Sequence, residues 1–121
     1  MKRYTTDHEW IELDGDVATV GITGHAQDQL GDIVYVELPE VGRSVAAAEA
    51  VATVESTKSV SDIYSPVAGE VSEVNPVPVD DPARLNAEPE SGAWLFRLSG
   101  VTATDLENLM DAAAYELFCS G

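Results

Sequence analysis

The chain has 121 residues, 45% of them hydrophobic, and its 22 acidic residues against six lysines and arginines give a formal net charge of −16. This length suffices for one domain with its own core, so we expect a single domain over residues 1–121. The charge excludes nucleic acid as a partner, because phosphate binding requires a basic face. It favours docking on basic surfaces of other proteins, at rates that fall as salt rises.

The N-terminal residues show no targeting segment. They lack the apolar core of a secretory signal and the length of an Arg- and Ser-rich transit peptide. No apolar run in the chain approaches membrane-spanning length, so no membrane partner is expected. The single cysteine, Cys119, excludes an internal disulfide and suits a reducing compartment. We expect a cytoplasmic bacterial protein, or a mitochondrial one only if a transit peptide has been removed.

The first part of the chain has the pattern of short strands separated by turn residues. Asp14-Gly15 predicts a tight hairpin turn between the first two strands. Thr23 is the expected N-cap of a short helix, and Gly31 its end. The strand after this helix is apolar on both faces at its start and is therefore expected to be well buried. The predicted strands are residues 10–13, 17–22 and 33–38, and the helix spans 23–31.

A hairpin is predicted over residues 51–65, where two β-branched runs flank Ser56-Thr57-Lys58-Ser59. Lys58 lies at its tip and, apart from Lys2, is the only lysine of the chain. A lysine there presents a primary amine on a flexible four-carbon stem, away from the body of the protein. A covalently attached prosthetic arm needs this geometry, although a turn lysine taken alone is more often simply solvated.

The last third of the chain combines a long loop, one strand and two helices. Residues 75–93 contain four of the six prolines and are expected to be irregular; loops of this length are usually functional or disordered. A strand over residues 94–98 should point Trp94, Phe96 and Leu98 inward and Arg97 outward. Two short C-terminal helices, about residues 104–119, are expected to pack onto the sheet. The first would begin with a capping box at residues 104–107, and Asp111 would cap the second.

Catalytic signatures are missing from the sequence. It has no nucleophile elbow, phosphate-binding loop or dinucleotide fingerprint. His8 and His25 are far apart, and neither they nor Cys119 have metal-ligand spacing, so no metal site is predicted. A small acidic β domain of this kind is best interpreted as a carrier or adaptor, not an enzyme.

Several blocks of sequence, taken in order, carry a specific resemblance. They are H-E-W at 8–10, V-A-T-V-G-I-T at 17–23, A-Q-D-Q-L-G-D-I-V-Y-V-E-L-P-E-V-G at 26–42, E-S-T-K-S-V-S-D-I-Y-S-P-V-A-G-E-V-S-E-V-N at 55–75, N-A-E-P at 86–89 with Trp94, and A-Y-E at 114–116. Nearly from end to end, the chain resembles the H-protein family of the glycine cleavage system, which are lipoyl carriers.

The resemblance implies a mainly β fold, a barrel-sandwich hybrid of two small sheets with short N-terminal and C-terminal helices. It implies that lipoic acid is attached to Lys58. The carrier would take the aminomethyl group of glycine from a pyridoxal-phosphate glycine decarboxylase to a tetrahydrofolate-dependent aminomethyltransferase, and dihydrolipoyl dehydrogenase would reoxidise it. A tethered arm replaces diffusion of an unstable group by a high effective concentration.

The resemblance also assigns roles to four further residues. Glu9 and Asp62 would line a surface cleft and accept hydrogen bonds from the cationic amine of the cargo. Asn86 would lie in the long loop beside this cleft, and Glu55 would be read by lipoyl-attaching enzymes. The chain departs from the family pattern at four positions expected on the cleft side, namely Gln29, Arg84, Glu90 and Ala93.

Three alternatives stand beside glycine cleavage. Lipoyl or biotinyl domains of other complexes usually have an acid or a methionine flanking the lysine, whereas Thr57 and Ser59 flank Lys58 here. An H-like relay protein would instead donate lipoate to other carrier domains. A plain interaction module would carry no modification, which an intact mass spectrum would reveal.

Overall fold

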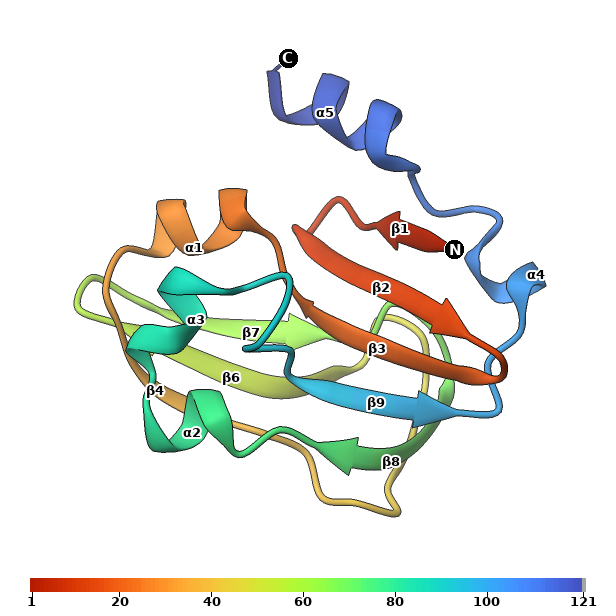
Figure 1. Cartoon of the computed structure of the whole chain (residues 1–121), viewed down its shortest axis with the longest axis horizontal. Coiled ribbons are helices and arrows are strands. Elements are labelled where there is room, and N and C mark those ends of the chain that lie inside the picture. Colours follow the sequence, from red (N-terminus) through yellow and green to blue (C-terminus); the bar gives the residue numbers. More distant parts are fainter. Residues whose placement is uncertain (121) are drawn as a thin grey trace.

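A computed structural model describes residues 1–120 of the chain. The elements, in chain order, are β1 (Lys2–Tyr4), β2 (Glu9–Asp14), β3 (Val17–Ile22), α1 (Gly24–Leu30), β4 (Ile33–Glu37), β5 (Ser44–Val45), β6 (Ala50–Ser56), β7 (Val60–Tyr64), β8 (Gly69–Val74), α2 (Val77–Asp80), α3 (Ala83–Ala87), β9 (Phe96–Ser99), α4 (Ala103–Leu106) and α5 (Ala112–Ser120). Figure 1 shows the β6–β7 hairpin reaching out beneath α1, while α5 lies over β1. None of the described helices is long and apolar enough to cross a membrane.

The strands form two antiparallel sheets. One has six strands in the order β1-β2-β3-β9-β8-β5, and the other has three in the order β4-β6-β7. The predicted mainly β fold of two sheets with short helices is therefore confirmed. Over residues 1–120 the larger sheet is open, since β1 and β5 form its two edges, and no closed barrel results.

One hydrophobic core joins the two sheets. Ile11, Val20 and Phe96 of the larger sheet and Val54 of the smaller one are each 0% exposed and belong to the same cluster. Burial of such side chains is the main force that holds the sheets face to face. The hairpin that carries Lys58 is thus anchored through its base in this core.

The predicted short helix is confirmed, together with both of its ends. The Thr23 side chain accepts a hydrogen bond from the Ala26 amide, 3.1 Å away, and Gly31 ends α1 with φ 83°. The preceding hairpin turn is one residue later than predicted. Asp14 still pairs with Val17, so the two-residue loop is Gly15-Asp16. Gly15 has φ 66° whereas Asp16 does not have a positive φ, which is the pattern of a type II′ turn with glycine at its first central position.

The expectation that β4 is well buried at its start is wrong. Only Ile33 and Val36 are buried, whereas Val34 and Tyr35 are 54% and 46% exposed. The strand lies at the edge of the smaller sheet, and its register with β6 shifts between Ile33 and Tyr35. A bulge of this kind turns successive side chains out of strict alternation, so the apolar run does not imply burial on both faces.

Two predictions for residues 75–98 need correction. The long loop is not irregular throughout, because it contains α2 and α3, and Leu85 of α3 is fully buried. The last strand begins at Phe96; Phe96 and Leu98 point inward as predicted, but Trp94 does not. Its ring is only partly buried and lies 4.0 Å from the Arg97 guanidinium, which favours the face of an indole.

The C-terminal helices are confirmed, but the capping box lies two residues earlier than predicted. It joins Thr102 to Asp105, because the Asp105 carboxylate accepts from the Thr102 amide at 2.9 Å. Asp111 caps α5 as predicted, accepting from the Ala114 amide at 2.8 Å. The Tyr115 ring of α5 stacks on Tyr4 of β1, with centroids 4.6 Å apart.

Candidate functional site

The tip of the β6–β7 hairpin is held rigidly by its own hydrogen bonds. The Ser56 side chain accepts from the amides of Lys58 and Ser59, each at 3.1 Å, and the Ser56 amide donates to the Ser59 carbonyl at 2.8 Å. The Thr57 amide donates to the Asp32 carbonyl at 3.0 Å, which ties the tip to the segment after α1. The backbone at Lys58 therefore has one defined conformation, although its side chain is solvated.

The Lys58 side chain extends from this tip past the end of α1. A Cβ atom added to Gly31 would lie 2.9 Å from Lys58 Cε. Lys58 is exposed and joins none of the ion pairs found within residues 1–120, whereas Lys2 Nζ bonds Glu90 at 3.1 Å and lies 4.9 Å from the Trp10 ring. Of the two lysines, Lys58 is therefore the accessible amine.

A pocket of about 350 Å³ lies between α1 and β7, beside the hairpin. Its apolar lining is Ile22, Ala26, Leu30 and Ile63, and its polar lining includes Asp7, His8, Gln29 and Asp62. The walls of the pocket are both close to Lys58. Asp62 lies on the same hairpin as Lys58, and α1 ends at Gly31, which the Lys58 side chain passes. A flexible arm on Lys58 therefore has a nearby cavity that combines apolar side chains with polar ones, including the exposed carboxylate of Asp62.

Glu9 lies behind the wall of this pocket and does not line it. Its side chain is 1% exposed, and its two carboxylate oxygens accept from Thr5 Oγ1 and from the Tyr64 amide, each at 2.9 Å. Burial raises the pKa of Glu9 from its ordinary 4.5 to about 7, although both hydrogen bonds oppose the shift. Its neighbour in the chain, His8, and its partner Tyr64 both line the pocket.

The raised pKa of Glu9 predicts a stability that falls with rising pH. Between pH 4.5 and about 7 the carboxyl of the unfolded chain has lost its proton while that of the folded chain still holds it. The unfolded state therefore binds fewer protons, and the free energy of unfolding decreases as pH rises through this range. Glu9→Gln should remove this component, since a neutral amide cannot titrate.

Thermal unfolding from pH 4.5 to 8, with EDTA in every buffer, tests this prediction. The melting temperature of Glu9→Gln should fall less steeply with pH than that of the parent. Glu12→Gln, which changes an exposed acid on the same strand, is the matched control and should keep the parental slope. Parallel curves for the parent and Glu9→Gln would contradict the pKa shift.

Asn86 also lies outside the pocket and braces one end of it. Its Nδ2 donates to the Gly31 carbonyl at 2.8 Å and to Gln27 Oε1 at 3.0 Å, and its Oδ1 accepts from the Ile33 amide at 2.9 Å. These bonds join α3 to the end of α1, where the Lys58 side chain passes. Of the predicted site residues, Asp62 thus lines the pocket and Lys58 lies outside it on the same hairpin. Glu9 and Asn86 do not line the pocket but bond to the elements around it.

Comparison with known proteins identifies the family of this chain. The family model "Glycine cleavage H-protein" matches residues 2–121. The chain belongs to this family. It is 55% identical over 116 residues to the glycine cleavage system H protein of Phenylobacterium zucineum (96% of each chain), and 49% identical over 120 residues to that of Thermotoga maritima (99% of this chain, 97% of the relative).

A crystal structure of the glycine cleavage system H protein from Mycobacterium marinum has the same fold. It superposes with a TM-score of 0.90 at 40% sequence identity and covers 99% of this chain and 97% of its own. Two sheets with short helices are therefore the arrangement shared with a solved H protein.

Among the four departures from the H-protein pattern, only Gln29 lines the pocket, so the expected placement was wrong for the other three. Arg84 pairs with Glu88 on the outside of α3, and Ala93 is buried in the core. Glu90 accepts from the Gly24 amide at 3.0 Å and pairs with Lys2, which fixes the start of α1. Sequence spacing alone gave no signal for this contact.

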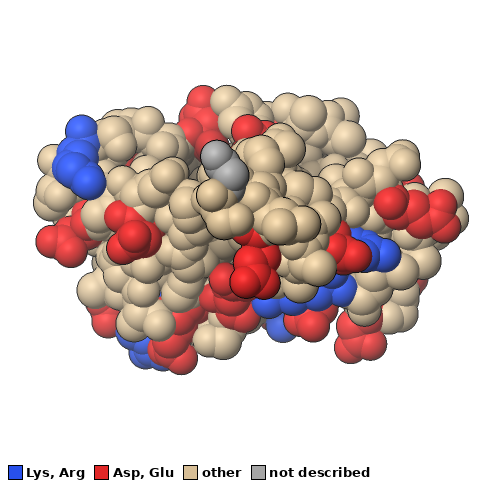
Figure 2. All heavy atoms as spheres, turned by 90° about the horizontal axis from the view of Figure 1, so that it is seen from above, with Lys and Arg blue, Asp and Glu red and all other residues tan. Residues whose placement is uncertain are grey.

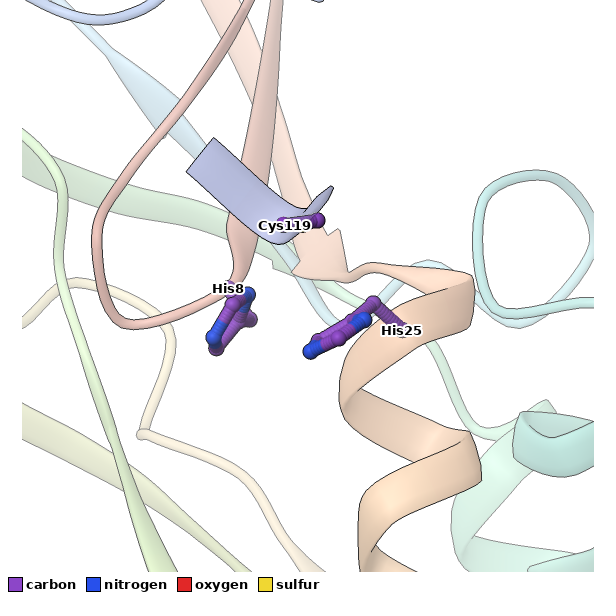
Figure 3. Close-up of side chains that lie close together, drawn as sticks. All are labelled: His8, His25 and Cys119. Atoms are coloured by element: carbon purple, nitrogen blue, oxygen red, sulfur yellow. The ribbon is translucent and has the colours of Figure 1, made fainter. Parts of the chain in front are cut away.

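Two histidines and the cysteine, which have no metal-ligand spacing in the sequence, lie close together in the structure. One ligand atom from each of His8, His25 and Cys119 is within 4.8 Å of those of the other two (Figure 3). They come from the β1–β2 loop, α1 and α5, so no local motif could have indicated the cluster. Burial and the neighbouring His25 lower the pKa of His8.

Proposed function

We propose that Lys58 is the lipoylation site and that this chain is the lipoyl carrier of a glycine cleavage system, with no catalytic activity of its own. The observation that supports it most is the single exposed lysine on a rigid hairpin tip, in a chain that belongs to the H-protein family. Once attached, the lipoyl group supplies a disulfide that takes up the aminomethyl group of glycine. The role of the protein is to hold this arm on the hairpin tip and to shield it from water in the pocket.

The pocket fits a lipoyl arm in size and chemistry. Ile22, Ala26, Leu30 and Ile63 offer apolar surface for the hydrocarbon part, and burial of each methylene contributes about 0.8 kcal/mol. We propose that Asp62, which is exposed at the pocket, accepts a hydrogen bond from the cationic amine of the cargo. Glu9 would position Tyr64 of the pocket lining, and Asn86 would hold the end of α1 beside Lys58.

The carrier must dock on several enzymes, which we propose are glycine decarboxylase, aminomethyltransferase, dihydrolipoyl dehydrogenase and lipoyl-attaching enzymes. In Figure 2, acidic side chains outnumber basic ones and are scattered around the visible face, in keeping with the net charge of −16. Such a surface favours partners with basic patches and association rates that fall with salt. The bacterial relatives support the cytoplasm as the proposed location.

Glu55 lies where an enzyme that modifies Lys58 would approach. It is paired with Tyr35 on one side and with Val60 on the other, both largely exposed, so it lies between two apolar side chains on one face of the smaller sheet. We expect Glu55→Ala to slow lipoylation about tenfold while the melting temperature stays within 2 °C, which corresponds to a small surface effect. Rates would be measured by intact mass with a lipoyl ligase.

The matched control for this prediction is Glu37→Ala, an exposed acid on the neighbouring strand β4. It should be lipoylated at the parental rate. Equal lipoylation of Glu55→Ala and the parent would rule out the recognition role and leave the attachment site itself untouched.

Reconstitution tests the proposed function as a whole. Lipoylated protein mixed with glycine decarboxylase should release carbon dioxide from glycine, at a rate that falls as salt rises because exposed charges are screened over about 10 Å at 0.1 M. Addition of the other two enzymes should complete the pathway. A lipoylated sample that passes lipoate to other carrier domains but never accepts an aminomethyl group would instead establish the relay function.

A further inference from the structure

The cluster of His8, His25 and Cys119 has the composition of a metal centre. Two imidazoles and one thiol lie within 4.8 Å of one another and come from three separate elements (Figure 3). All three residues are partly buried, so the group is shielded but reachable from solvent. Neither the hairpin nor the arm chemistry uses these residues as a group. We propose that they form a binding site for one zinc-type divalent ion.

The His8 ring is fixed in an orientation suited to ligation. Its Nδ1 lies 2.8 Å from the Tyr115 hydroxyl, which in turn lies 2.7 Å from Thr23 Oγ1. The second ring nitrogen, Nε2, thus remains for a metal. Histidine ligands commonly donate their other N–H to a partner that sets tautomer and orientation, and a tyrosine hydroxyl that donates to Thr23 can accept this bond.

The backbone at His8 is held in a conformation that few residues adopt. Its φ is 66°, in the left-handed region, where a non-glycine residue carries some strain. Two hydrogen bonds maintain it, from the His8 amide to the Thr5 carbonyl at 3.1 Å and from the Thr23 amide to the His8 carbonyl at 3.0 Å. The ring is thereby held beside that of His25, with centroids 4.5 Å apart and ring planes tilted by 34°.

The kinds of ligand atom in the cluster and the distances between them indicate which ion would bind. Two imidazole nitrogens and a thiolate suit Zn²⁺, whereas Mg²⁺ and Ca²⁺ prefer oxygen ligands. Tetrahedral Zn²⁺ with bonds of about 2.0–2.1 Å to nitrogen and about 2.3 Å to sulfur places its ligands roughly 3.3–3.6 Å apart. Binding of the ion therefore requires side-chain rotations that bring the ligand atoms from their present separation, within 4.8 Å, to that spacing. Three protein ligands leave a fourth position for water.

Such an ion would lie at the edge of the arm pocket and fasten the C-terminal helix. His8 lines the pocket, and Cys119 lies on α5, which otherwise rests on β1 chiefly through the Tyr4–Tyr115 stack. Binding of an ion to the folded state alone raises stability in proportion to the logarithm of its concentration. The site would therefore couple metal supply to the order of α5.

Titration of the full-length Lys58→Arg protein with Zn²⁺ and with Co²⁺ tests the site, because this background carries no lipoyl thiols that could compete. We expect one Zn²⁺ per chain by calorimetry and a melting temperature that rises with Zn²⁺. Co²⁺ should give a thiolate charge-transfer band and the visible bands of tetrahedral coordination. In this background Cys119→Ser should abolish the charge-transfer band and, like His25→Ala, weaken binding at least tenfold.

Two controls separate the cluster from the acidic surface. Ser120→Ala, next to Cys119 and exposed, should bind as the background does, and Mg²⁺ should not compete with Zn²⁺. Saturable binding that persists unchanged in both Cys119→Ser and His25→Ala, or the lack of any charge-transfer band with Co²⁺, would overturn the proposal. Neither outcome would affect the assignment of Lys58 as the lipoylation site, because that assignment is tested by intact mass and not by metal binding.

Discussion

Lys58→Arg should take up no lipoyl group at all, while its fold and stability stay those of the parent. Arginine keeps the positive charge of the exposed side chain, but its guanidinium stays protonated and cannot act as the nucleophile that forms the amide. A solvated surface change of this kind alters the free energy of unfolding by about 0.5 kcal/mol at most. Incubation with lipoate, ATP and a lipoyl ligase, followed by intact mass, measures the loss.

The chain provides its own matched control for this experiment. Lys2→Arg changes the only other lysine, which is held by Glu90 and the Trp10 ring, and should still gain one lipoyl group. Glycine-dependent release of carbon dioxide should disappear with Lys58→Arg and survive with Lys2→Arg. A lipoyl mass on the Lys58→Arg protein would show that attachment occurs elsewhere.

Local signals predicted the parts of the fold that depend on neighbouring residues. The cap at Thr23 and the stop at Gly31 act within one helix, and the hairpin around Lys58 is closed by bonds of Ser56 to residues two and three positions away. One clear error occurred where pairing between strands decides the outcome. The bulge of β4 arises from its register with β6, which the pattern of apolar residues in β4 alone does not encode.

In the candidate site, too, local features could be predicted from the sequence and long-range contacts could not. Lys58 is recognisable because its hairpin is local, and Asp62 follows on the same hairpin. The burial of Glu9 could not be predicted, because its carboxylate is satisfied by a Tyr64 amide 55 positions away. The neighbourhood of His8 depends on α5, whose Tyr115 is 107 positions distant in the chain. Contacts over such separations follow from how the elements pack, and the sequence carries no short motif for them.

In the proposed function, protection of the cargo depends on whether the arm can enter the pocket. Free in solution, the aminomethyl group is open to water, which would hydrolyse it to formaldehyde and ammonia and leave a free thiol. Burial of two or three methylenes of the arm against Ala26, Leu30 and Ile63 contributes about 2 kcal/mol. That energy corresponds to roughly thirtyfold in the ratio of docked to undocked arm. Blocking the pocket should therefore increase the loss of cargo by up to this factor.

Ala26→Trp would place an indole in the ≈ 350 Å³ pocket, and Gln29→Trp would do the same from an exposed position that tolerates bulk more easily. Both variants should be lipoylated at the parental rate, since Lys58 and its hairpin are unchanged, yet release formaldehyde and ammonia roughly ten to thirty times faster after loading. Val41→Trp, at an exposed residue outside the pocket lining, should behave like the parent. Asp62→Asn should give a smaller increase, about fivefold, because one exposed charged contact contributes about 1 kcal/mol at most. If both tryptophan variants keep their cargo as long as the parent does, the arm is shielded somewhere other than this pocket.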